Sequence, residues 1–104
     1  MAEPMKIRAS MQGDVADVKV LFNHIMETGL RKDAKTGQLV PALYIQEVTA
    51  TINGATVMTA NWGTGVSKNP LVGFKVKGAK AGDKVAVSWV DNTGDKRTDE
   101  ATIS

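Results

Sequence analysis

The chain has 104 residues, of which 42% are hydrophobic and 23% charged, and it contains no cysteine. The missing cysteine excludes a disulfide scaffold, a cysteine zinc site, an iron–sulfur cluster and a thiol nucleophile on this chain. A net charge of +2 and an aromatic content of 5% argue against a base-stacking surface for nucleic acid. The length fits a single domain, residues 1–104.

The first half of the chain shows four short runs in which apolar and polar residues alternate. We expect strands at residues 6–9, 15–22, 44–52 and 56–62. In the second run Val18, Val20 and Phe22 share one face, as a half-buried strand requires. Asn53 and Gly54 predict a two-residue hairpin turn between the third and fourth strands, because both residues tolerate a positive φ.

The second half repeats this pattern. We expect strands at residues 72–77 and 85–90 and a final strand whose last inward residues are Ala101 and Ile103, with turns at residues 78–83 and 92–94. The period is two residues, and no stretch carries a sustained helical stripe. Seven short strands separated by turns predict an all-β fold, an immunoglobulin-like antiparallel β-sandwich.

Two segments break this rhythm. Residues 24–42 form a long connection between the second and third strands, and residues 63–70 form a glycine-rich connection after the fourth. Long loops in compact domains are often functional. We therefore expect these two loops to carry the binding surface, and the lysines of the second half to be either solvated or part of a cationic surface for an anion.

Catalytic and cofactor chemistry is hard to build from these residues. His24 is the single histidine, so a multi-histidine metal site is excluded. It could act as a general base beside Ser67 or a carboxylate, but a hydrogen-bonding loop histidine is the simpler interpretation. Lys68 stands where a dinucleotide loop needs its third glycine, and residues 91–95 fit a hairpin turn better than a calcium loop. We predict no cofactor and no metal.

The N-terminal residues carry no targeting signal. Residues 1–5 lack an apolar run, and no stretch approaches the ~20 apolar residues of a membrane helix. We therefore expect no signal peptide on this chain and no membrane contact.

Four blocks of sequence together resemble the SoxZ family. They are HIMETGLRKD at residues 24–33, YIQEV at 44–48, WG with VSKNP at 62–63 and 66–70, and VSWVDN at 87–92. The similarity spans nearly the whole chain. Two positions depart from the family pattern: Ile25 stands where a proline often follows the histidine, and Leu71 stands where an aromatic residue often follows Asn-Pro. The loss of proline would leave the first loop less rigid.

This resemblance implies a non-catalytic subunit of the heterodimeric SoxYZ carrier, which serves bacterial thiosulfate and sulfur-compound oxidation. The partner subunit, SoxY, holds the sulfur intermediates covalently on a cysteine in its C-terminal arm. The carrier would make transient contact with the Sox cytochromes, hydrolase and sulfur dehydrogenase. The resemblance also implies a periplasmic location reached without a signal peptide, by export together with the partner subunit.

The residues that we predict to bind the partner lie in the two irregular loops. They are Met26, Leu30, Arg31, Trp62, Ser67, Lys68 and Asn69. The first two and the tryptophan would supply apolar area, the arginine a bidentate pair with a carboxylate, and the lysine a bias toward an anionic adduct. The alternatives are a stand-alone periplasmic binding domain for a small sulfur oxyanion and an enzyme with His24 as base. The heterodimer could assemble further, and an isolated chain could self-associate through its partner face.

Overall fold

The computed structural model describes residues 4–66 and 68–104, which form seven strands. The strands are β1 (Lys6–Gln12), β2 (Val15–Leu21), β3 (Ile45–Ile52), β4 (Ala55–Asn61), β5 (Leu71–Lys77), β6 (Lys84–Asp91) and β7 (Lys96–Thr102). No helix in the described ranges has the length and apolarity needed to span a membrane.

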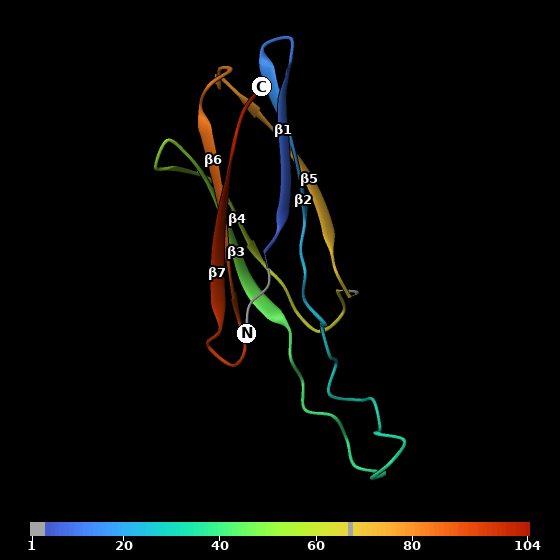
Figure 1. Cartoon of the computed structure of the whole chain (residues 1–104). Coiled ribbons are helices and arrows are strands. Elements are labelled where there is room, and N and C mark those ends of the chain that lie inside the picture. Colours follow the sequence, from blue (N-terminus) through green and yellow to red (C-terminus); the bar gives the residue numbers. More distant parts are fainter. Residues whose placement is uncertain (1–3, 67) are drawn as a thin grey trace.

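The strands build two antiparallel sheets that face each other (Figure 1). One sheet has the order β1-β2-β5 and the other the order β4-β3-β6-β7. The all-β immunoglobulin-like sandwich is therefore confirmed. In the immunoglobulin constant-type arrangement the fourth strand joins the first sheet, whereas here β4 pairs with β3. This placement leaves β4 at the edge of the four-stranded sheet.

The core lies between the two sheets and follows from the two-residue alternation. The largest fully buried side chains come from β2, β3 and β6 and from the segments after β2 and β7; they are Trp89, Phe22, Ile45, Ile103, Val18, Val20, Val48, Val85 and Val87. Full burial of one such aliphatic side chain contributes about 1.5–3 kcal/mol. These contacts give the two loops a rigid support.

The predicted turn at Asn53 and Gly54 is confirmed, since both residues have positive φ angles of 50° and 87°. The predicted end of the first strand at residue 9 was too early. β1 continues to Gln12 because its last residues pair with the start of β2. The turn begins only there, with Gly13 at a φ of 69°.

Residues 24–43, here called the arm, extend away from one end of the sandwich (cyan to green in Figure 1). The overall dimensions of 53 × 21 × 19 Å include this projection. The arm is not an open loop, because its two halves pair through isolated bridges at Glu27–Leu43 and Lys32–Leu39. The irregular segment of the sequence is therefore a narrow, paired extension.

Candidate partner-binding surface

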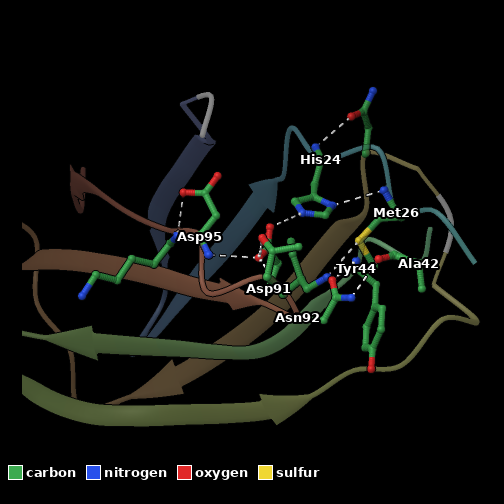
Figure 2. Close-up of polar contacts among 11 residues, drawn as sticks. His24, Met26, Ala42, Tyr44, Asp91, Asn92 and Asp95 are labelled. Carbon is green, nitrogen blue, oxygen red and sulfur yellow. Dashed lines mark hydrogen bonds and ion pairs between the residues drawn. The ribbon is translucent and has the colours of Figure 1, made fainter. Parts of the chain in front are cut away.

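His24 anchors the base of the arm (Figure 2). Its side chain is buried, and its ring packs edge-on against Trp89 at a centroid distance of 5.1 Å. Nδ1 accepts a hydrogen bond from the main-chain N–H of Met26 at 3.1 Å. The remaining proton therefore lies on Nε2, which donates to Oδ2 of Asp91 at 3.1 Å. Both ring nitrogens are engaged within the chain, so the geometry gives His24 a structural role.

Asp91 collects hydrogen bonds at the end of β6. Its Oδ1 accepts from the hydroxyl of Thr93 at 2.6 Å and from the main-chain N–H groups of Thr93 and Asp95 at 2.9 and 3.1 Å. Burial raises the pKa of the Asp91 carboxyl, but the hydrogen bonds from Thr93, His24 and Asp95 outweigh it and leave that pKa below its ordinary value. The predicted hairpin turn at residues 91–95 is thus held by a carboxylate.

Met26 lies at the base of the arm, and its side chain points into the sandwich. Its φ of 52° is unusual for a residue with a Cβ atom, and its side chain is buried in the core. The sulfur accepts a hydrogen bond from the main-chain N–H of Ile45 at 3.4 Å. The apolar area of Met26, which we predicted to face a partner, therefore lies against this chain's own β3.

Asn92 fastens the other side of the arm's base (Figure 2). Its side-chain oxygen accepts from the N–H of Tyr44 at 2.9 Å, and its side-chain nitrogen donates to the carbonyl of Ala42 at 2.8 Å. Its own N–H donates to the carbonyl of Tyr44 at 3.0 Å. The last residue of the VSWVDN block thus holds residues 42–44, at the base of the arm, against the end of β6.

The exposed part of the arm carries two leucines. Leu30 is 81% exposed and Leu39 is 58% exposed. Leu30 was among the predicted contact residues. Sequence reasoning missed Leu39, which begins an apolar run directly after the largely polar residues 31–38. Two leucines held in water on a paired projection are typical of a contact surface.

Arg31 pairs within the arm. Its guanidinium binds the Glu27 carboxylate through Nε and a terminal nitrogen, with the shortest contact at 2.8 Å. These hydrogen bonds hold the pKa of Glu27 below its ordinary value, and the charge of Lys68 lowers it further. The carboxylate that Arg31 was predicted to seek in a partner is therefore already present in this chain.

The glycine-rich loop lies beside the arm's base. Asn69, with a φ of 50°, accepts from the His24 N–H at 3.1 Å and donates its own N–H to the His24 carbonyl at 2.9 Å. Trp62 is half-buried and packs edge-to-face on Phe22 at 5.1 Å. Lys68 is exposed, and Ser67 lies outside the described residues. The structure thus brings the two predicted loops together, and partner binding through them stays a prediction.

Among residues 4–66 and 68–104 no three His, Cys, Asp or Glu side chains gather as a metal site would require. A shallow depression of about 510 Å³ lies on the three-stranded sheet, over β1 and β2. It is lined by Arg8, Ala9, Ser10, Gln12, Asp17, Lys19 and Ser104. Its charged side chains are Arg8, Lys19 and Asp17, and it is separate from the two loops.

Comparisons with known proteins bear on the fold and on the family of this chain. The fold resembles that of a superoxide reductase (neelaredoxin) from Archaeoglobus fulgidus in its reduced form, with a TM-score of 0.61 over 99% of this chain and 87% of that chain. At 20% sequence identity this likeness concerns the fold alone. No curated protein matches the sequence. The family model of sulphur oxidation protein SoxZ matches residues 5–102. The chain therefore belongs to the SoxZ family.

Proposed function

We propose that this SoxZ-family chain is the non-catalytic subunit of a SoxYZ-type carrier. It would bind the SoxY-type subunit, whose C-terminal cysteine arm carries the sulfur intermediates. With no cysteine, this chain has no thiol on which to hold sulfur. The single histidine is committed to two hydrogen bonds inside the fold. Both facts favour a supporting role over a catalytic one.

The observation that carries the proposal is the arm with its exposed leucines, Leu30 and Leu39. The arm is fastened on one side by His24 and on the other by Asn92, so its leucines are presented from a rigid base. A preorganised projection loses little conformational entropy when it docks. Lasting heterodimers bury roughly 2,000 Å² or more with an apolar centre, and these two leucines could contribute to that centre.

The arm is tested by truncating both leucines together. Leu30→Ala with Leu39→Ala should weaken binding of a SoxY-type subunit by about tenfold or more, since central apolar anchors carry much of an interface's free energy. Val90→Ala, an apolar truncation on the outer face of β6, is the control and should change the affinity less than about twofold. Equal affinities for the double variant and the native chain would remove the arm from the interface.

For location, we propose the periplasm, reached by export with the signal-bearing partner. Transient contacts with Sox cytochromes, hydrolase and sulfur dehydrogenase would follow from service as a carrier. Fractionation of cells with and without the SoxY-type gene tests this: the chain should lose its periplasmic location when the partner is absent. A periplasmic chain in both strains would contradict export as a pair.

One observation favours a second candidate, a binding domain for a small sulfur oxyanion. The depression is lined by Arg8 and Lys19 together with Asp17, and no ion pair neutralises Arg8 or Lys19 among the described residues. Calorimetric titration of the isolated chain with thiosulfate separates the candidates. The carrier function predicts no measurable heat without the partner, whereas an oxyanion-binding domain would bind and would lose affinity in Arg8→Ala.

A further inference from the structure

β4 occupies an edge, and its outer main-chain groups have no strand beside them in the described sheets. The N–H of Trp62 donates to the carbonyl of Gln46 at 2.8 Å, which fixes the phase of the ladder between β3 and β4. Main-chain groups alternate along an antiparallel ladder, so those of Ala60 face β3. Those of Thr59 and Asn61 face away and are available to another strand.

This edge is also free of charge. Residues 48–67 contain no Asp, Glu, Lys or Arg, although 23% of the whole chain is charged. The other three edge strands do carry charges: Lys6 and Arg8 in β1, Lys75 and Lys77 in β5, and Lys96, Arg97, Asp99 and Glu100 in β7. Charged side chains are a common guard against strand pairing. β4 therefore lacks the charged residues that the other three edge strands carry.

The side chains of β4 suit an added strand. Met58 and Ala60 pack against the core, while Val57, Thr59 and Asn61 are exposed on the outer face. Val57 keeps 38% of its surface exposed. Beta-branched and small uncharged residues pack well beside a neighbouring strand, and none of them repels one electrostatically. The register between β3 and β4 shifts where Val57 is the extra residue of β4, opposite Ala50 and Thr51, so residues 58–61 keep a regular register.

The free edge is continuous with the two loops. After Asn61 the chain enters Trp62 and the glycine-rich loop, and Asn69 of that loop is bonded to His24 at the base of the arm. The carboxyl end of β4 therefore lies at the same end of the sandwich as the arm (Figure 1). A partner seated on the arm's base could reach this edge without crossing the body.

We infer that the free edge of β4 pairs with an uncharged extended strand of the SoxY-type partner subunit, which would add a strand to the four-stranded sheet. The inference rests on the proposed function and adds the mode of contact. Main-chain hydrogen bonds specify an extended segment, and the missing charges specify an uncharged one. An edge without charged residues can pair with other chains and aggregate, and lasting cover by a partner subunit would prevent this.

Amide hydrogen exchange of the complex tests this pairing directly. Exchange of the Thr59 and Asn61 amides should be slowed by about tenfold or more when the SoxY-type subunit binds, because each N–H gains an acceptor. A lysine on the edge gives an independent readout. Thr59→Lys should weaken the complex by about tenfold or more, while Thr98→Lys, an exposed threonine on the edge strand β7, should change it less than about twofold.

The outcomes separate this inference from the function on which it rests. A complex of native affinity in Thr59→Lys, with fast exchange at Thr59 and Asn61, overturns the edge pairing and leaves the carrier function standing. If the native chain forms no complex with the SoxY-type subunit, the carrier function itself is overturned. A third outcome is that the native chain alone forms a dimer with slow exchange at these amides, while Thr59→Lys leaves its complex with the partner unchanged. That result assigns the edge to a second copy and overturns the partner assignment.

Discussion

His24 and Asn69 are joined by two hydrogen bonds, one between main-chain groups and one from the main chain of His24 to the side chain of Asn69. The N–H of Asn69 donates to the His24 carbonyl at 2.9 Å, and the N–H of His24 donates to the side-chain oxygen of Asn69 at 3.1 Å. This pair joins the start of the arm to the glycine-rich loop. The two segments that break the strand pattern are therefore one structural unit.

Substitution of Asn69 should separate the contributions of its side chain and its backbone. Asn69→Gly removes the side-chain acceptor while tolerating the φ of 50°, and should cost about 1 kcal/mol of unfolding free energy. Asn69→Ala adds the left-handed strain of about 1–2 kcal/mol and should be less stable than the glycine variant. Urea unfolding measures both. Equal stability of the two variants would show that the positive φ is not retained.

Asp91 should make stability depend on pH in the acidic range. The pKa of its carboxyl is lowered by folding, so the unfolded chain binds the proton more readily. Its contribution to stability is present above the ordinary value of 3.8 and is lost as the pH falls through the lowered folded value. The stability difference between the native chain and Asp91→Asn should therefore shrink between about pH 5 and pH 2.

The matched control for this pH series is Asp14→Asn, which removes an exposed carboxylate from the turn after β1. Urea unfolding at each pH gives the free energies. A gap between the native chain and Asp91→Asn that stays constant from pH 5 to pH 2 would contradict the role given to the hydrogen-bonded carboxylate.

His24→Gln should lower stability without abolishing sulfur oxidation. Both ring nitrogens make buried hydrogen bonds, so the substitution should cost about 1–3 kcal/mol. A reconstituted Sox system supplied with saturating variant should still oxidise thiosulfate, because the proposed function assigns no chemistry to this ring. Lost oxidation with an intact complex would instead favour His24 as a catalytic base.

Met26→Leu should reveal the bond to the sulfur. Leucine conserves the buried volume but leaves the N–H of Ile45 without its acceptor, which should cost about 1 kcal/mol. Met58→Leu replaces a half-buried methionine of β4 and serves as the control. Thermal unfolding compares them, and an equal loss in both variants would argue that the sulfur contact contributes nothing.

Much of the fold was predictable from local pattern. Alternation located all seven strands, because burial on one face of a sheet imposes a two-residue period. The turn at Asn53 and Gly54 followed from the residues that tolerate positive φ. The pairing of Glu27 with Leu43 was not predictable, since it depends on hydrogen bonds between residues far apart in the chain.

The candidate surface was predictable in its location more than in its residues. Leu30 and Lys68 are exposed, as contact residues must be. Met26 faces inward because its positive φ redirects the side chain, and no sequence pattern announces that conformation in methionine. Arg31 already has a partner in Glu27, four residues earlier, and only the paired arm brings those side chains together.

Calorimetric titration of this chain with a SoxY-type subunit tests the central claim most directly. The carrier function predicts a one-to-one complex with a Kd of about 1 μM or below, and no heat when thiosulfate is added to this chain alone. Absence of binding to the subunit, together with saturable binding of thiosulfate by the isolated chain, would contradict it.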